Sequence, residues 1–193
     1  MFDPNDIFIS LVGTSRLTHF CFNLELYSNF SFRDNLHINV IYNGEYNLKE
    51  LININNLFCD NIIILTENKG SYHGALDGIN VSLKNFIESD KKIAVIHNFD
   101  YLFFYDNPFK IMITDLLKSG KSFFGWRGKK THPLQKTIYE TDCFVITKEF
   151  ATQIYPINPK DDTTIFYRKV LAKDSGGDVN VMEEWFFQKL VNI

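Results

Sequence analysis

The sequence has few cysteines, little excess charge and no long hydrophobic run, and each shortage excludes a class of protein. Its three cysteines, Cys21, Cys59 and Cys143, are far apart in apolar surroundings, which argues against a disulfide framework or a zinc site. A net charge of -3 argues against sequence-independent nucleic-acid binding, which needs clustered Lys and Arg. No apolar run reaches the ~18 residues of a membrane span, and the N-terminus has no signal-peptide pattern. We therefore expect a cytoplasmic protein without a transmembrane segment, and docking to a membrane surface is compatible with this.

The sequence is rich in apolar strand-like runs. Its 193 residues are 45% hydrophobic, enough for one domain with its own core. Runs of Ile, Val and Phe alternate with segments of helical periodicity, a pattern typical of an α/β protein with a mostly parallel sheet covered by helices. We expect strands at 6–13, 36–42, 61–66, 92–97, 121–126 and 141–147. We expect helices at 18–30, 48–57, 72–88, 108–119 and 181–190, with a short one near Glu149.

Ligands of open parallel sheets bind beyond the carboxyl ends of the strands, so the polar residues there are the first candidates for a binding site. Thr14, Ser15 and Arg16 follow the first strand, where two hydroxyls and a guanidinium suit a phosphate. Helix capping with a solvated Arg16 explains them equally simply, and it is the favoured interpretation of this stretch alone. Neither GxGxxG nor GxxxxGK[ST] occurs in the sequence, which disfavours dehydrogenases and P-loop proteins.

Asn98 and Asp100 follow the fourth strand. In an extended chain, residues two apart face the same way, so both side chains are expected to face the cleft while Phe99 faces inward. Hard oxygen ligands of this kind suit Mg²⁺ or Mn²⁺ shared with a diphosphate. The alternative is ordinary turn chemistry. His97 is a secondary candidate for contact with a phosphate or sugar, although a hydrogen-bonded core role is commoner at such a position.

Two later segments also carry candidate residues. Gly74 and Gly78 lie inside a helical pattern, where each costs about 1 kcal/mol relative to Ala, so packing or a ligand gains from a close approach of the backbone there. Asp77, next to Gly78, is expected to lie at the rim. Glu183 and Glu184 begin the last expected helix; one of them suits a general base, and a solvated acidic pair at a helix start is the alternative.

Taken in order, these positions resemble the GT-A-fold glycosyltransferases, which transfer a sugar from a nucleotide-sugar donor. The resemblance covers nearly the whole chain. In that family a small hydroxyl residue ends the first strand, an N-x-G segment and a glycine-containing helix follow the third, D-x-D ends the fourth, and an acidic pair supplies the base. The matching residues here are Thr14, Asn68, Asp77, Asn98, Asp100, Glu183 and Glu184. The resemblance implies a Rossmann-like three-layer α/β/α sandwich over 1–193, either a whole protein or the catalytic module of a longer one.

The resemblance also implies an activity. We expect metal-assisted, inverting transfer of a sugar from a UDP-, GDP- or dTDP-linked donor to a hydroxyl of a glycan or other acceptor, as in polysaccharide biosynthesis, with Mn²⁺ or Mg²⁺ as cofactor. The expected nucleotide-sugar site comprises Thr14, Ser15, Arg16, Glu45, Asn68, Asp77, Asn98 and Asp100. Asp100 and Asn98 would hold the metal, Glu184 or Glu183 would be the base, and Trp126 and Asp142 would contact the acceptor. Core packing of Trp126 is an equal alternative.

Two positions depart from the family pattern. Asn98 replaces the first Asp of D-x-D, so metal binding would rest mainly on Asp100, and a metal-independent variant is conceivable. The acidic pair is Glu-Glu, with Glu184 matching the base position. Two other functions stay open: a sugar nucleotidyltransferase, which would need a more glycine-rich loop after the first strand, and a GT-A-like domain that binds a glycan or protein without catalysis.

Overall fold

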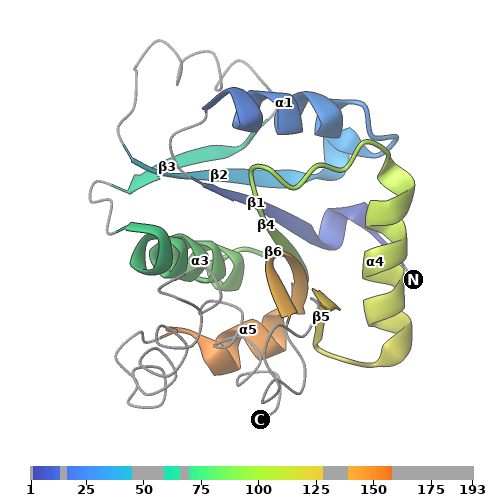
Figure 1. Ribbon diagram of the computed structural model, residues 1–193. Helices are drawn as coiled ribbons and strands as arrows, with labels where there is room; N and C mark the ends of the chain where they lie inside the picture. Colours follow the sequence, from blue (N-terminus) through green and yellow to red (C-terminus); the bar gives the residue numbers. More distant parts are fainter. Residues whose placement is uncertain (1, 14–16, 45–58, 66–69, 128–138, 158–193) are drawn as a thin grey trace.

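A six-stranded mixed sheet forms the centre of the computed structural model, which describes residues 2–13, 17–44, 59–65, 70–127 and 139–157 (Figure 1). The strands are β1 (Ile7–Gly13), β2 (His37–Asn43), β3 (Asn61–Leu65), β4 (Ile93–Asn98), β5 (Phe123–Arg127) and β6 (Tyr139–Thr147). The helices are α1 (Leu17–Ser28), α3 (Gly70–Glu88), α4 (Asp106–Ser119) and α5 (Lys148–Ile154), with two short 3-10 turns at Pro4–Asp6 and Arg33–Asn35. All six expected strands are present within two residues at each end.

The strand order in the sheet is β3-β2-β1-β4-β6-β5. The first four strands are parallel, with Val12 of β1 opposite both Ile41 of β2 and Asn98 of β4. β6 lies between β4 and β5 and runs antiparallel to both. The sheet is therefore mostly parallel, as the alternating sequence pattern predicted, and its antiparallel part begins where that alternation weakens.

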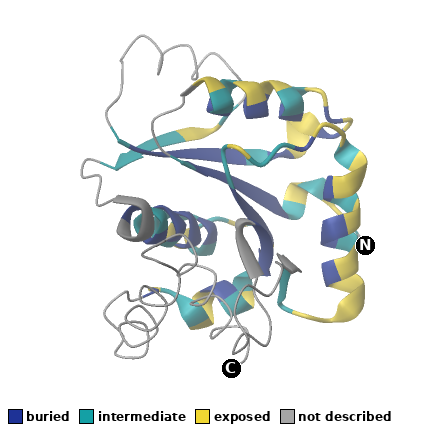
Figure 2. Ribbon diagram, viewed as in Figure 1, coloured by how far each residue is buried: buried dark blue, intermediate teal, exposed yellow. Residues whose placement is uncertain are grey.

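The two faces of the sheet support separate halves of the core, because strand side chains alternate between faces. Ile7, Ile9 and Leu11 of β1 pack with α1 and α4, whereas Phe8 and Val12 pack with α3. Figure 2 shows the central strands as the most buried part of the chain and the helices as buried along their inner sides. Both faces of these strands are covered, as expected of continuous apolar runs without a polar face. The predicted three-layer α/β/α arrangement is confirmed.

Local sequence explains the bounds of α4. Pro108 lies in its first turn, where the missing N–H costs no intrahelical hydrogen bond, and the helix begins two residues earlier than expected, at Asp106. Gly120 ends the helix in the left-handed conformation with φ of 64°. The expected helices at 48–57 and 181–190 lie outside the described residues.

Candidate functional site

The carboxyl ends of β1 and β4 form a topological switch point of the sheet. From β1 the chain proceeds to β2 on one side, whereas β4 pairs with β1 on the other side. Open α/β sheets bind ligands at such points, because the connections leave the sheet in opposite directions. β1 ends at Gly13 and β4 at Asn98, and the Phe99 N–H donates to the Val12 carbonyl at 3.1 Å. The candidate residues after these two strands are thus brought to one place.

A tight turn follows β4. The Tyr101 N–H donates to the Asn98 carbonyl at 3.1 Å, so the chain turns over residues 98–101. The expectation of an extended chain through Asp100 is therefore wrong, and the alternation of strand side chains cannot be used to orient its carboxylate. Asn98 is half-buried and Asp100 is exposed. The turn thus presents one carboxylate to solvent directly beyond the switch point.

Phe99 anchors this turn, and it faces inward as expected. Its ring stacks on His19 with centroids 5.3 Å apart and packs against Phe20 at 5.5 Å. It also lies so close to Gly13 that a Cβ at that position would overlap three ring carbons. Glycine at the end of β1 is therefore required by the packing of the turn.

His97, the secondary candidate, is a buried residue with both ring nitrogens engaged. Its Nε2 lies 2.6 Å from the Tyr27 hydroxyl, and its Nδ1 lies 2.9 Å from the Asn98 carbonyl oxygen. Burial lowers the pKa of His97 to about 4, against a smaller opposing effect of hydrogen bonds to the backbone at Asn98 and Tyr101. The imidazole is therefore neutral near pH 7. The hydrogen-bonded core role applies to His97.

The close approach expected at the glycines of α3 is explained by packing at Gly78. A Cβ on Gly78 would overlap Cγ1 of Val12, so the missing side chain lets α3 lie directly against the end of β1. Asp77 beside it is half-buried. This packing brings the first half of α3 to the same edge of the sheet as Gly13 and Asn98.

Three buried polar atoms near this edge lack a hydrogen-bond partner among the described residues. They are Oδ1 of Asn43, Nδ1 of His19 and Oδ1 of Asn23. Asn43 is the last residue of β2 and its side chain is almost fully buried. Buried polar groups are normally hydrogen-bonded, so unpartnered ones mark places where a ligand or water can supply the bond. Sequence reasoning explained Asn43 by turn chemistry and did not select His19 or Asn23.

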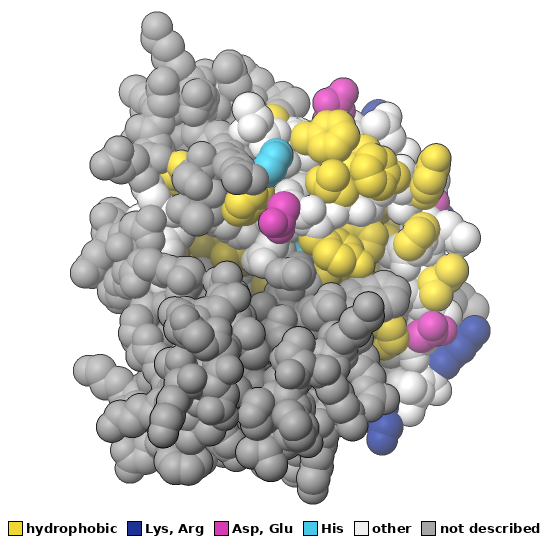
Figure 3. All heavy atoms as spheres, viewed as in Figure 1, with side chains coloured by type: hydrophobic (Ala, Val, Ile, Leu, Met, Phe, Trp, Pro, Cys, Tyr) yellow, Lys and Arg dark blue, Asp and Glu magenta, His cyan; other side chains and the backbone are white. Residues whose placement is uncertain are grey.

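The segment after the turn also exposes aromatic rings. Phe104 and Tyr105 are exposed, and Phe104 meets the exposed Phe22 of α1 edge-on with centroids 6.4 Å apart. Figure 3 shows hydrophobic side chains gathered over α1, over the segment between β4 and α4, and over α4 itself. The segment that carries Asp100 therefore also presents apolar surface to solvent.

The remaining sequence candidates are not placed by the structure. Thr14, Ser15, Arg16, Glu45, Asn68, Glu183 and Glu184 lie outside the described residues. Trp126 belongs to β5 and Asp142 to β6, but their side chains are not described. Among the candidates that the structure does describe, Asn98 and Asp100 share one turn at the switch point, and Asp77 lies on α3, which packs there.

The described residues include no group of three His, Cys, Asp or Glu side chains that could hold a metal ion. A site for Mg²⁺ or Mn²⁺ does not require such a group. Mg²⁺ and Mn²⁺ keep several waters and take few protein ligands when they share phosphate oxygens. The exposed carboxylate of Asp100 and the amide oxygen of Asn98 are hard donors of the right kind. A metal at this turn would complete its coordination with ligand phosphates and water.

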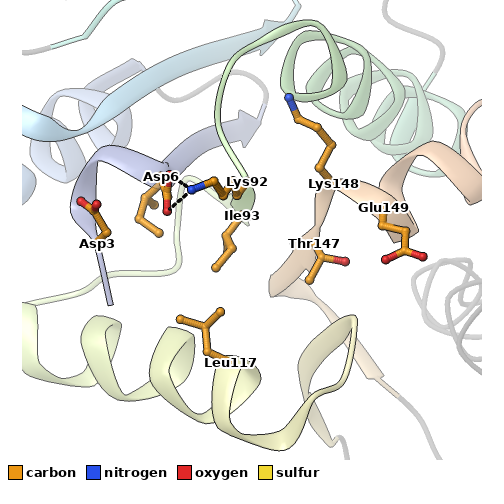
Figure 4. A pocket seen from close by; sticks show the side chains of 9 residues that line it. Asp3, Asp6, Lys92, Ile93, Leu117, Thr147, Lys148 and Glu149 are labelled. Atoms are coloured by element: carbon orange, nitrogen blue, oxygen red, sulfur yellow. Dashed lines mark hydrogen bonds and ion pairs between the residues drawn. The ribbon is translucent and has the colours of Figure 1, made fainter. Parts of the chain in front are cut away.

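A pocket of about 310 Å³ lies at the opposite ends of the strands, lined by residues that include Asp3, Asp6, Lys92 and Lys148 (Figure 4). Lys92 pairs with the Asp6 carboxylate at 2.9 Å, and Asp3 accepts from the Asn5 N–H at 3.0 Å. Lys148 points away from the pocket, donates to the Ser89 carbonyl and lies over the Phe86 ring. Asp3, Asp6, Lys92 and Lys148 each have a partner within the protein, which indicates a structural role.

The fold agrees with that of solved glycosyltransferases. A mannosyltransferase from Pyrobaculum calidifontis, solved with GDP-Man and Mn²⁺, is 12% identical with a TM-score of 0.63, and the match covers 97% of this chain and 53% of that one. TarS from S. aureus matches at 9% identity and a TM-score of 0.54, over 78% of this chain and 30% of that chain. Its 1–349 form matches at 10% identity and a TM-score of 0.57, over 96% and 55%.

The chain therefore shares the fold of a glycosyltransferase. It spans about half the length, or less, of the solved chains that it matches. No protein-family model matches the sequence, and no curated protein is significantly similar to it. Of the helices that the structure describes, none combines the length and the apolar character needed to cross a membrane.

Proposed function

We propose that this chain is the nucleotide-sugar-binding and catalytic part of a GT-A-type glycosyltransferase. The observation that carries the proposal is the turn Asn98–Tyr101 at the switch point, in a fold shared with a mannosyltransferase solved with GDP-Man and Mn²⁺. Its donor would be a nucleoside diphosphate sugar, and its acceptor a hydroxyl of a glycan or other molecule. Inversion at the anomeric carbon follows from the resemblance to inverting members.

The residues would divide the work as follows. Asp100, with Asn98, would hold Mn²⁺ or Mg²⁺, which neutralises charge on the departing diphosphate. Thr14, Ser15 and Arg16 would bind phosphate oxygens through hydroxyl and guanidinium donors. The further contacts with the nucleotide sugar are assigned to Glu45, Asn68 and Asp77, with Asn43 added because its buried Oδ1 has no partner among the described residues.

The acceptor side rests on residues later in the chain. Glu184, or its neighbour Glu183, would take the proton from the acceptor hydroxyl as the hydroxyl oxygen forms the new bond to the sugar. Trp126 would stack on the acceptor and Asp142 would accept a hydrogen bond from it. Replacing each glutamate by Gln in turn tests the base, because the amide keeps the shape of the side chain and removes its basicity. Transfer that survives both substitutions unchanged would remove the proposed base.

Thermal unfolding measured with UDP-, GDP- and dTDP-sugars, each with and without Mn²⁺, tests the proposal. We expect one nucleotide class to raise the midpoint with Mn²⁺, and Asp100→Ala to lose the metal-dependent part. Asp115→Ala is a matched control, since Asp115 is an exposed aspartate on α4 outside the proposed site. The absence of a shift with every nucleotide would contradict the proposal.

Asn98 favours one alternative function. An amide is a weaker metal ligand than a carboxylate, so a glycan- or protein-binding domain without turnover fits the same residues. Donor hydrolysis and transfer separate the two functions, because a binding domain would be stabilised by ligand without consuming the donor. A sugar nucleotidyltransferase would instead release or consume pyrophosphate, which a phosphate assay detects after hydrolysis by an inorganic pyrophosphatase.

A further inference from the structure

Helix α1 presents three polar side chains toward the turn after β4. His19, Asn23 and Tyr27 are spaced four residues apart, and such residues lie along one face of a helix. His19 stacks on the Phe99 ring, Asn23 donates its side-chain N–H to the Phe99 carbonyl, and Tyr27 meets His97. One face of α1 therefore contacts Phe99 of the turn through two side chains and His97, near the end of β4, through a third.

The hydrogen bonds from Tyr27 to the turn have a defined direction. A backbone carbonyl can only accept, so Nδ1 of His97 carries the hydrogen that is donated to the Asn98 carbonyl. In a neutral ring Nε2 is then the acceptor, and the Tyr27 hydroxyl donates to it at 2.6 Å. The carbonyl of Asn98 also accepts from the Tyr101 N–H. The chain Tyr27, His97, Asn98 thus ends on the carbonyl that closes the turn.

The His97 ring has little freedom to leave this arrangement. It and the Tyr27 side chain are each about 1% exposed. Phe103 lies edge-on to the imidazole at 5.5 Å and Tyr101 at 6.1 Å. Close packing on several sides keeps a side chain in one rotamer, because a different rotamer would overlap its neighbours.

We propose that α1 positions the Asn98–Tyr101 turn through Tyr27, His97 and Asn23, and so fixes where Asp100 stands. For its effect on ligand binding, this inference rests on the proposed function. α1 begins at Leu17, directly after the proposed phosphate-binding residues Thr14, Ser15 and Arg16 in the sequence. The helix that holds the turn with Asp100 would then be the one that follows the proposed phosphate-binding residues in the sequence. His97 would be a positioning residue and would not touch the substrate.

Tyr27→Phe tests the inference, because it removes only the hydroxyl that orients His97. Ser10→Ala is the matched control: the Ser10 hydroxyl makes a buried 2.7 Å hydrogen bond with Ser82 on the opposite face of the sheet. Both variants lose one buried hydrogen bond and are expected to be destabilised to a similar degree. A purely structural role for Tyr27 predicts that they behave alike at the turn.

The first readout is made without ligand. Hydrogen exchange of the Tyr101 amide is measured by NMR. We expect its rate to be about tenfold higher in Tyr27→Phe than in Ser10→Ala. The ¹⁵N shifts of the His97 ring should show hydrogen on Nδ1 in the wild type and lose that preference in the variant. Equal exchange of the Tyr101 amide in both variants would overturn the inference.

The second readout is the affinity for GDP, UDP and dTDP in the presence of Mn²⁺, measured by calorimetry. Tyr27→Phe should lower the affinity for the nucleotide that the wild type binds about tenfold, whereas Ser10→Ala should leave this affinity within twofold of the wild-type value. If Tyr27→Phe does not fold, His97→Gln replaces it; this variant keeps a donor and an acceptor and should retain part of the protection of the Tyr101 amide. A wild type that binds none of the three nucleotides contradicts the proposed function, while amide exchange still decides whether α1 positions the turn.

Discussion

The two ends of the parallel strands differ in how their polar groups are satisfied. At the amino ends, Asp6 pairs with Lys92, Asp3 bonds to Asn5, and the Lys92 backbone N–H donates to the Asp6 carbonyl at 2.9 Å. At the carboxyl ends, Asn43 keeps a buried oxygen without a partner among the described residues, and Asp100 is exposed on a firmly packed turn. The difference teaches that charge and a pocket do not by themselves make a site.

Packing shows the same contrast. The carboxyl edge requires glycine where β1 meets the turn and where α3 meets β1. Close approaches of this kind hold the backbone in place around a position where a ligand can bind, which lowers the ordering cost of binding. The amino edge instead has a partly exposed ion pair between Lys92 and Asp6, and such pairs contribute little to stability. The following predictions test this comparison.

The largest effect is expected for Gly13→Ala. The new methyl group would overlap the Phe99 ring, which must then leave its stacking position on His19. We expect the free energy of unfolding to fall by roughly 3 kcal/mol, the upper range for overpacking, and nucleotide binding to be lost. Chemical denaturation and calorimetry measure the two changes.

Gly120→Ala is the control for this substitution. Gly120 has φ of 64°, so alanine is strained there, but no atom lies within 4 Å of the added carbon. We expect a loss of about 1 kcal/mol and unchanged nucleotide binding. A Gly13→Ala protein as stable as Gly120→Ala would contradict the packing described at the carboxyl edge.

A pH effect of nearly the same size is expected from His97. Its pKa is about 4 in the folded protein against 6.5 for the ordinary group, so the unfolded chain takes up a proton first as the pH falls. The stabilisation is complete above about pH 6.5 and is lost progressively between pH 6.5 and 4, up to about 3 kcal/mol. Urea unfolding at several pH values measures it. In His97→Gln the free energy of unfolding should lose this dependence on pH between 6.5 and 4, whereas His37→Gln should retain it. The same pH dependence in the wild type and in His97→Gln would contradict the assignment to His97.

The smallest effect is expected at the amino edge. Lys92→Met removes the ion pair with Asp6, whose carboxylate raises the pKa of Lys92 through a hydrogen bond and its charge. Because the lysine is exposed, we expect the thermal midpoint to move by about 3 °C or less and nucleotide binding to stay unchanged. Loss of binding in Lys92→Met would show that the comparison of the two edges is wrong.

Particular residues show how far the sequence leads. The apolar runs predicted all six strands and the mostly parallel sheet, because residues buried on both faces of a strand leave a continuous hydrophobic signal. The position of β6 between β4 and β5 was not predicted, since it depends on long-range pairing that no local pattern encodes. The Asn98-Phe99-Asp100 segment was selected correctly as the end of a strand, but its turn was missed.

The three polar side chains on one face of α1, His19, Asn23 and Tyr27, were missed for a different reason. Tyr27 fitted the apolar face of the helix, so its hydroxyl was not considered, and His19 and Asn23 were not selected. A signal was present, since His, Asn and Tyr recur every four residues within one helix. Their partners, however, lie 70 residues or more away in the sequence, at Phe99 and His97. Such partners are visible only once the strands are placed in order.

Paramagnetic broadening by Mn²⁺ in the presence of the nucleotide that stabilises the protein most tests the central claim directly, because the effect falls steeply with distance from the ion. The account predicts that the amide signals of Gly13, Asp100 and Tyr101 broaden first, that those of Asp6 and Lys92 stay sharp, and that Asp100→Ala abolishes the pattern. Broadening centred on the amino ends of the strands, or unchanged in Asp100→Ala, would contradict it.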